Sequence, residues 1–153
     1  MKKLTLISIL VVIILFLVLL FLISDWSLNV QEEKIVTKII DGDTIIVEGG
    51  ETIRLLGYDC DERGKPCYQT AKERMEELVL GEKVIIEIEG VDKDLYGRGL
   101  RYVFLNEKNI NKQMVEEGYC VARFPEESKY KEDIVNAEQF AILNKVGCKW
   151  SEN

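Results

Sequence analysis

The sequence contains no histidine, and this absence excludes several common catalytic designs. Ser-His-Asp triads, Cys-His pairs and H-E-x-x-H zinc sites all require an imidazole. Acid-base chemistry in this chain must therefore come from carboxylates. Positive charge is also scarce, because 20 lysine and arginine residues stand against 27 acidic residues. A general basic surface for nucleic acid is excluded, so a phosphate site would need locally gathered arginines or a metal cation.

Residues 4–23 carry no charge, and Lys2 and Lys3 precede them. A helix over this run would span roughly 30 Å, the thickness of the hydrocarbon layer of a membrane. We therefore predict a membrane segment over residues 1–23 and a linker over 24–33. No A-x-A pattern follows the run, which favours an uncleaved anchor over a cleaved signal peptide and secretion, the alternative. Because the lysines come first, the positive-inside rule places residues 24–153 outside the cytoplasm.

Residues 34–153 have the length of one domain with a single hydrophobic core, so we expect one site and a monomer. All 27 acidic residues but only 18 of the 20 basic ones follow residue 23, which gives this part a net charge of −9.

The chain has four cysteines, at positions 60, 67, 120 and 148. An even number in an oxidising compartment predicts disulfide bonds. A zinc site is the alternative, but the spacings lack the short paired-cysteine motif of such sites. Three pairings are possible. Proximity favours Cys60 with Cys67, which leaves Cys120 with Cys148.

Short strands dominate the first part of the predicted domain. The pattern indicates strands in KIVTKII (34–40), TIIVE (44–48) and TIRLLG (52–57), with a hairpin turn at Gly49 and Gly50. A helix over 68–79 follows, ended by Gly81. Two more strands are indicated, in KVIIEIEGV (83–91) and LRYVFL (100–105).

Helical spacing of apolar residues predicts helices over 111–117 and 129–144. Strands with one inserted helix, followed by helices, indicate an α+β, mainly β fold. Five strands with a helix before the fourth fit the five-stranded OB-fold barrel, here with three helices, whose strand faces and loops often bind oligonucleotides.

The turns between the predicted strands collect carboxylates and arginines. The set consists of Asp41, Asp43, Arg54, Asp59, Glu62 and Arg98. Carboxylates that converge from different loops suit a hard cation such as Ca²⁺. A further carboxylate can take a proton from water, and arginines can neutralise charge that grows on phosphorus. Each part alone is also typical of an ordinary turn or surface ion pair, but together they describe phosphodiester hydrolysis.

Three motifs in order carry a family resemblance. They are VTKIIDGDTIIV, IRLLGYDCDE and DLYGRGLRYVFL. Together they closely resemble the staphylococcal nuclease (thermonuclease) family over about residues 34–151. Membership would imply an OB-fold barrel and Ca²⁺-dependent cleavage of DNA and RNA with low sequence specificity.

The resemblance also implies roles for single residues. Asp43 and Asp59 would be Ca²⁺ ligands, joined by the backbone carbonyl of Thr44. Glu62 would be the general base, and a Cys60–Cys67 bond would brace its loop.

The same motifs place Arg54 and Arg98 at the two positions that bind phosphate. Asp41 and Tyr96 match neighbouring positions that support the metal site or the substrate.

Three positions depart from the family pattern. Asp61 replaces a proline before the glutamate, which predicts a less rigid loop. Leu95 stands where a basic residue can bind phosphate, and Phe124 where an aromatic hydroxyl is expected, so substrate affinity should be reduced more than the chemistry. The alternatives are a non-catalytic OB-fold module that binds nucleic acid, and a disulfide-linked surface domain with no site.

Overall fold

A computed structural model describes residues 11–18, 31–124 and 127–151 of the chain. The elements after residue 30 are β1 (Gln31–Ile39), β2 (Thr44–Val47), β3 (Thr52–Leu55), β4 (Tyr58–Asp59), α2 (Tyr68–Val79), β5 (Lys83–Lys93), β6 (Gly99–Leu105), β7 (Lys108–Asn109), α3 (Ile110–Glu116), β8 (Val121–Ala122), α4 (Lys131–Asn144) and α5 (Gly147–Trp150).

The predicted membrane segment falls largely outside the described residues. Within it, residues 11–18 are helical and their side chains are exposed. Among the residues that the structure describes, no helix is long and apolar enough to cross a membrane.

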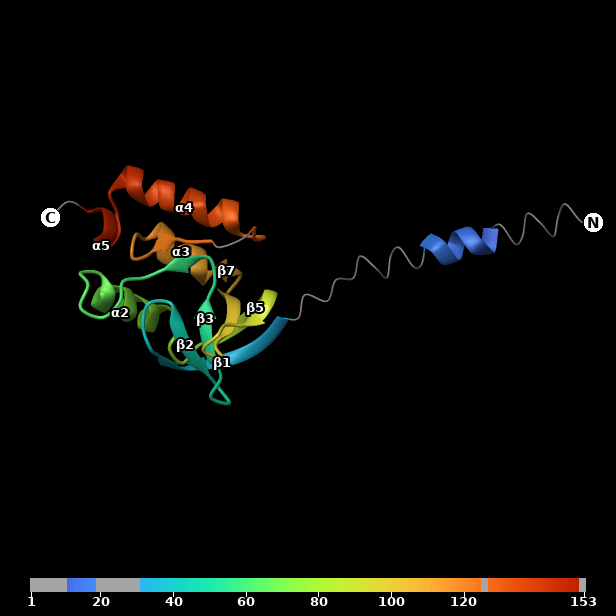
Figure 1. The fold of residues 1–153 in the computed structure, drawn as a ribbon, viewed down its shortest axis with the longest axis horizontal. Helices are drawn as coiled ribbons and strands as arrows, with labels where there is room; N and C mark the ends of the chain where they lie inside the picture. The colour runs from blue at the N-terminus through green and yellow to red at the C-terminus, as the bar shows by residue number, and fades with distance from the viewer. Residues whose placement is uncertain (1–10, 19–30, 125–126, 152–153) are drawn as a thin grey trace, which may run out of the picture.

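The main sheet is a closed barrel of five strands (Figure 1). Strands follow the order β3-β2-β1-β5-β6, and the short β7 adds to β6. Parallel pairing of β3 with β6, with Ile53 opposite Gly99, closes the sheet on itself. Closure removes the open sheet edges, as in an OB fold. The predicted barrel is confirmed.

Local sequence explains the first hairpin of the barrel. Antiparallel pairing places Ile45 opposite Ile53, and both side chains are buried. Gly49 and Gly50 turn the chain between β2 and β3 with φ angles of 85° and 82°, which glycine adopts at low cost. The hairpin predicted at these glycines is confirmed.

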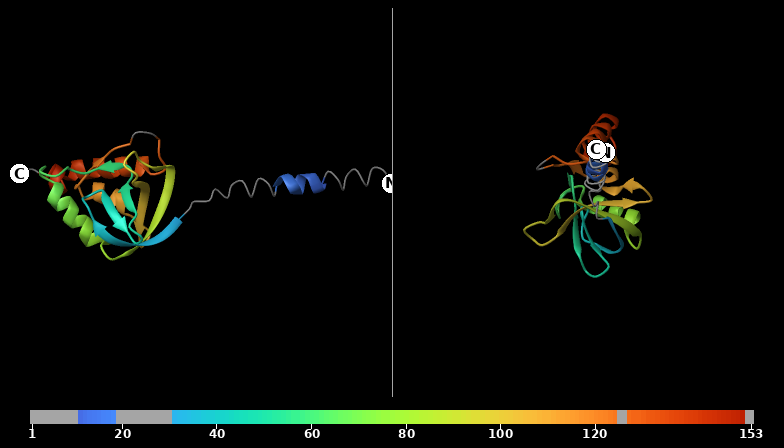
Figure 2. Two further views of the ribbon diagram at one scale, coloured as in Figure 1. Left: turned by 60° about the horizontal axis from the view of Figure 1, so that its bottom comes forward. Right: turned by 90° about the vertical axis from the view of Figure 1, so that its right-hand side faces the viewer.

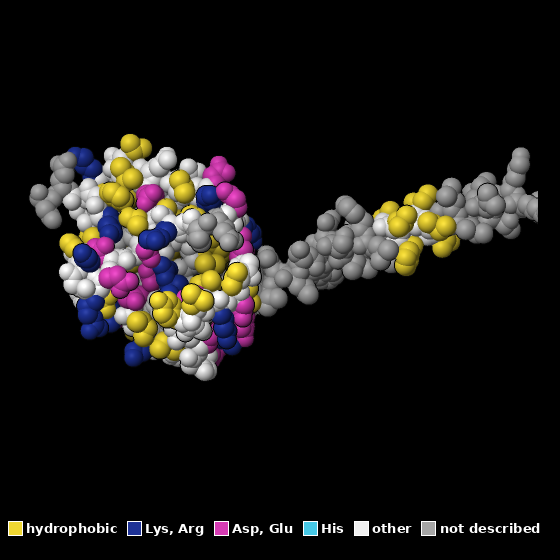
Figure 3. Space-filling model, viewed as in Figure 1, with side chains coloured by type: hydrophobic (Ala, Val, Ile, Leu, Met, Phe, Trp, Pro, Cys, Tyr) yellow, Lys and Arg dark blue, Asp and Glu magenta, His cyan; other side chains and the backbone are white. Residues whose placement is uncertain are grey.

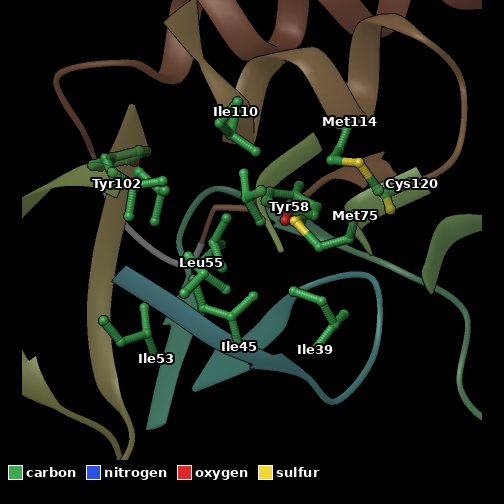
Figure 4. Close-up of a cluster of buried hydrophobic side chains, with 14 of the residues drawn as sticks. Ile39, Ile45, Ile53, Leu55, Tyr58, Met75, Tyr102, Ile110, Met114 and Cys120 are labelled. Carbon is green, nitrogen blue, oxygen red and sulfur yellow. The ribbon is translucent and has the colours of Figure 1, made fainter. Parts of the chain in front are cut away.

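Helices α2 and α3 pack against the barrel, and α4 lies over α3 (Figures 1 and 2). In the core, apolar side chains of the strands meet Met75 of α2 and Met114 of α3 (Figure 4). Each fully buried aliphatic side chain of this kind contributes about 1.5 to 3 kcal/mol. The predicted helices are confirmed to within two residues at each end, and α5 adds one short helix that we did not predict.

A buried asparagine joins the barrel to α3. Asn111 accepts a hydrogen bond from the Val103 N–H at 2.9 Å and donates to the carbonyl oxygens of Leu56 and Arg101 at 2.9 and 3.2 Å. A buried amide requires such partners. The interaction fixes the end of β3 beside β6, where the candidate site begins.

The disulfide pairing that we predicted from proximity is wrong. The bonds join Cys60 to Cys120 and Cys67 to Cys148. Strand β4 pairs antiparallel with β8, with Asp59 opposite Val121. The same register places Cys60 opposite Cys120, with their Cα atoms 4.4 Å apart. Strand register therefore overrides nearness in the sequence, and Cys67, just before α2, is left to reach Cys148 in α5.

Candidate active site

Arg54 lies between the two carboxylates that we predicted as metal ligands. Its Nη2 atom is 2.7 Å from Asp59 Oδ1 and 3.2 Å from Asp43 Oδ2. The same guanidinium donates to the carbonyl oxygens of Leu55 and Tyr58. Several fixed acceptors hold a planar guanidinium in one orientation. The structure therefore brings Asp43, Arg54 and Asp59 together as predicted.

Strand pairing explains how residues distant in sequence meet here. Thr44 is opposite Arg54 in the β2–β3 pair, so Asp43, just before β2, lies beside the arginine. Arg54 is opposite Leu100 in the parallel β3–β6 pair, which brings Arg98 to the same region. Barrel closure thus places both predicted phosphate-binding arginines next to the carboxylates.

Asp43 is a buried carboxylate with several fixed partners. Its Oδ2 atom accepts a hydrogen bond from the Cys60 N–H at 3.0 Å, and its own N–H donates to Asp41 Oδ1 at 3.1 Å. Burial raises the pKa of Asp43 to about 6, although nearby Arg54 lowers it. Arg54 contacts both Asp43 and Asp59, and the more exposed Arg123 contacts Asp59 alone.

Thr44 has hydrogen bonds through both its backbone and its side chain. Its backbone carbonyl accepts hydrogen bonds from the N–H groups of Ile40 and Asp41 at 2.9 and 3.3 Å. Its hydroxyl donates to Asp43 Oδ1 at 3.1 Å and lies 3.5 Å from Arg98 Nη1. The carbonyl therefore takes part in the turn before β2, and the hydroxyl connects Arg98 to Asp43.

A tight turn presents Arg98. Asp94 accepts hydrogen bonds from the N–H groups of Tyr96 and Arg98 and from Arg98 Nε, at 2.9, 3.0 and 2.7 Å. Partial burial would raise the pKa of Asp94, but these hydrogen bonds outweigh it and hold the pKa below its usual value. Tyr96 itself is exposed, with its ring centroid 5.5 Å from the Arg98 guanidinium carbon. We did not single out Asp94, although aspartate before a Gly-containing turn is a known turn signal.

Glu62, the predicted base, is exposed in the loop between β4 and α2. Its side chain makes no hydrogen bond or ion pair with any residue that the structure describes. The loop that carries it is well anchored. Asp61 pairs with Lys149 and accepts a hydrogen bond from the Cys67 N–H at 3.0 Å. Asp61 thus connects the loop to α5, and whether the loop is less rigid than one with proline stays a prediction.

A surface hollow of about 610 Å³ lies beside these residues. Arg54, Asp59, Arg98, Arg123 and Phe124 contribute to its lining. Arg123 is one of six arginines in the sequence, and we did not predict it as a site residue because it lies outside the three motifs. On the face seen in Figure 3, acidic and basic side chains are intermingled and form no continuous basic patch, as the composition predicted.

Gly57 shapes the wall of this hollow. It has a φ of 85°, and a Cβ atom there would lie 2.7 Å from the Phe124 ring. Any larger residue would displace the ring. Phe124 therefore packs against the backbone between β3 and β4, while Leu95 is fully exposed on the turn that carries Arg98.

The donor set fits a hard divalent cation. Carboxylate oxygens of Asp43 and Asp59 come from two different turns, and such cations complete their shells with carbonyl oxygens and water. In the described ranges no cluster of three or more His, Cys, Asp or Glu side chains is arranged around one metal position. A cation here would therefore rely on two carboxylates.

A closed five-stranded barrel with carboxylates and arginines gathered beside one hollow is typical of an OB-fold protein. Comparison with known families agrees. Residues 52–152 match the model of the family described as staphylococcal nuclease homologue. The chain belongs to this family.

Curated relatives support the assignment. The thermonuclease of Staphylococcus hyicus is 33% identical over 123 residues, covering 74% of this chain and 72% of the relative. The thermonuclease of Staphylococcus intermedius is 33% identical over 120 residues, covering 72% and 71%. Endonuclease YncB of Bacillus subtilis is 34% identical over 128 residues, covering 76% of this chain and 60% of the relative.

Proposed function

We propose that this protein is a nuclease that hydrolyses phosphodiester bonds of DNA, RNA or both, with low sequence specificity and a requirement for Ca²⁺. The observation that carries the proposal is the Arg54 guanidinium held between Asp43 and Asp59, with Arg98 connected to Asp43 through the Thr44 hydroxyl. Family membership and relatives named thermonuclease and endonuclease support it.

Each residue has a defined task in this reaction. The Glu62 carboxylate takes a proton from water as the water oxygen attacks phosphorus. The bond from phosphorus to the leaving sugar oxygen breaks, and that oxygen takes a proton from solvent. Arg54 and Arg98 bind the phosphate oxygens, whose negative charge grows in the transition state.

Asp43 and Asp59 would hold the Ca²⁺ ion. When bound, the ion would polarise a phosphate oxygen and lower the pKa of a bound water. Asp41 would support the turn of Asp43 through the 3.1 Å hydrogen bond to its N–H. Asp94 keeps Arg98 in position through the 2.7 Å hydrogen bond from Arg98 Nε.

The first experiment incubates the purified protein with single-stranded DNA, and separately with RNA, in Ca²⁺ or in a chelator. Cleavage only with Ca²⁺ is expected. Binding without cleavage in both conditions would instead favour the alternative, a non-catalytic OB-fold module. If the protein neither binds nor cleaves nucleic acid, the remaining alternative is a disulfide-linked surface domain with no site.

Variants then test the single residues. Glu62→Gln, Arg54→Lys and Arg98→Lys should each lower kcat, for Glu62→Gln by about 10²- to 10⁴-fold, without unfolding the protein. Near-normal turnover in all three would refute the mechanism. Asp133→Asn removes one exposed carboxylate from the first turn of α4 and serves as the control.

Calorimetry tests the metal ligands. Asp43→Ala and Asp59→Ala should each weaken Ca²⁺ binding and abolish Ca²⁺-dependent cleavage. Unchanged Ca²⁺ affinity in both variants would move the metal site elsewhere.

We also propose that the domain works outside the cytoplasm, tethered by the N-terminal segment or released after its cleavage. The two disulfide bonds support this location, because such bonds persist in oxidising compartments. Protease treatment of intact cells tests it. Protection of the domain until the membrane is opened would contradict the proposal.

A further inference from the structure

The hollow has a third arginine that the proposed mechanism does not use. Arg123 directly follows β8 and lines the hollow with Arg54 and Arg98. The three side chains differ in exposure: 15% for Arg54, 30% for Arg98 and 74% for Arg123. Arg123 therefore lies at the rim of the hollow, and the other two lie deeper.

The backbone fixes Arg123 to the same small sheet as Asp59. Asp59 is opposite Val121 in the β4–β8 pair, and the Arg123 N–H donates to the Gly57 carbonyl oxygen at 2.9 Å. The Cys60–Cys120 bond joins the same two segments. The position of the Arg123 backbone relative to Asp59 is therefore set by hydrogen bonds and a covalent link.

The Arg123 side chain points toward the proposed site. Its Nη1 atom is 3.1 Å from Asp59 Oδ2, while Arg54 binds the other oxygen of the same carboxylate. One contact to a half-exposed carboxylate leaves most of the five N–H donors of Arg123 facing solvent. A planar guanidinium with free donors is suited to phosphate oxygens.

We propose that Arg123 binds a backbone phosphate that flanks the phosphodiester being cleaved. The inference rests on the proposed nuclease function and extends it to substrate length. Arg54 and Arg98, whose side chains are less exposed, bind the reacting phosphate. Arg123 at the rim adds one contact to the nucleic-acid backbone, in a domain that has few basic residues. A strand with two or more phosphodiesters is therefore bound better than a dinucleotide.

Binding measurements test the contact without catalysis. Fluorescence anisotropy of a labelled single-stranded oligothymidine, in a chelator and at several salt concentrations, gives the affinity and its salt dependence. Arg123→Ala should weaken binding several-fold and reduce the slope of log K against log salt by about 0.7, the value for one lost contact to a single strand. Arg123→Lys should keep most of the slope, because the charge remains.

Lys108→Ala is the matched control. Lys108 is an exposed cation on β7, outside the lining of the hollow. The variant changes net charge by the same amount as Arg123→Ala. An equal fall in slope for both variants would mean that only overall charge matters, and would overturn the proposal.

Kinetics with two substrates provide a second measurement. In Ca²⁺, Arg123→Ala should raise KM for the oligonucleotide with little change in kcat, and should not alter kcat/KM for a dinucleotide with one phosphodiester. An equal loss on both substrates would place Arg123 at the reacting phosphate and refute the flanking role. If the unsubstituted protein cleaves the oligonucleotide and Arg123→Ala binds it equally well, only this inference is refuted. If the unsubstituted protein neither binds nor cleaves the oligonucleotide, the proposed function is refuted as well.

Discussion

The disulfide pairing makes a quantitative prediction about stability. Cys60–Cys120 and Cys67–Cys148 join residues 60 and 81 positions apart. The two loops overlap, so with one bond intact the shortest path across the other is about 35 residues long and passes through the intact bond. In the chain-entropy model, closure of a loop of that length is worth about 4 kcal/mol.

Replacing either pair by serine should therefore lower the free energy of unfolding by about 4 kcal/mol. Reducing both bonds of the wild-type protein should lower it by about 8 kcal/mol. The first bond lost closes the path of about 35 residues, and the second closes its own longer loop, which is worth about 4 kcal/mol as well. Domains of this kind have a total stability of about 5 to 15 kcal/mol, so the reduced protein should be close to unfolding at 25 °C. The assay is urea unfolding, with and without reductant, followed by far-UV circular dichroism.

Single variants decide whether these residues are partners. If Cys67 and Cys148 share a bond, Cys67→Ser and Cys148→Ser should each cost about as much as the two together. The opposite result would be additive losses for Cys67→Ser and Cys148→Ser and non-additive losses for Cys67→Ser and Cys60→Ser. It would support the Cys60–Cys67 pairing and refute the pairing in the structure. Peptide mapping of protein isolated without reductant gives an independent answer.

Two further predictions concern ion pairs. Glu87, with a 3% exposed side chain, binds Lys129 Nζ at 2.8 Å, and Glu87→Gln should cost about 2 kcal/mol in urea unfolding because Lys129 is 48% exposed and partly solvated. Burial would raise the pKa of Glu87, but its hydrogen bonds from Lys129 and Tyr130 hold the pKa below the usual value. The stability that ionised Glu87 contributes should therefore be complete above about pH 4.5 and lost as pH falls through the folded-state pKa. Asp61→Ala and Lys149→Ala should each cost about 1 kcal/mol, with a coupling energy of about 0.5 kcal/mol in a double-mutant cycle, and zero coupling would show that the pair does not hold the loop.

Much of the fold could be predicted because its strands and helices are long enough to show a period. The alternation in residues 83–91 and the helical spacing in 129–144 both predicted elements that the structure contains. Strands β4 and β8 have two residues each, too few to show alternation. Their pairing determines the Cys60–Cys120 bond. Because we did not predict these two strands, we also predicted the wrong disulfide pairing.

The candidate site divides in a similar way. Asp43, Arg54, Asp59 and Arg98 could be predicted because they belong to ordered motifs. The Arg123 contact could not, since it depends on the β4–β8 pair. The carbonyl of Thr44 was assigned from the motif alone, and the structure adds the two hydrogen bonds that it accepts in the turn.

In the proposed mechanism, one carboxylate would connect metal binding to substrate binding. Asp59 accepts hydrogen bonds from Arg54 on one oxygen and from Arg123 on the other. A Ca²⁺ ion bound to Asp59 would neutralise part of its negative charge and so weaken its contacts with Arg54 and Arg123. Both guanidinium groups would then be free to bind phosphate. By linkage, phosphate binding must then strengthen Ca²⁺ binding by the same factor.

We expect a factor of about ten, within the usual range of such coupling energies. Titration of Glu62→Gln with Ca²⁺, with and without a saturating single-stranded oligonucleotide, measures it. The coupling should shrink in Arg123→Ala, because one of the two arginines that Asp59 holds is gone, and should persist in Lys108→Ala. Equal Ca²⁺ affinity in the presence and absence of oligonucleotide would show that Asp59 does not divide its charge between the metal and the arginines, and the proposed connection between the two binding steps would be wrong.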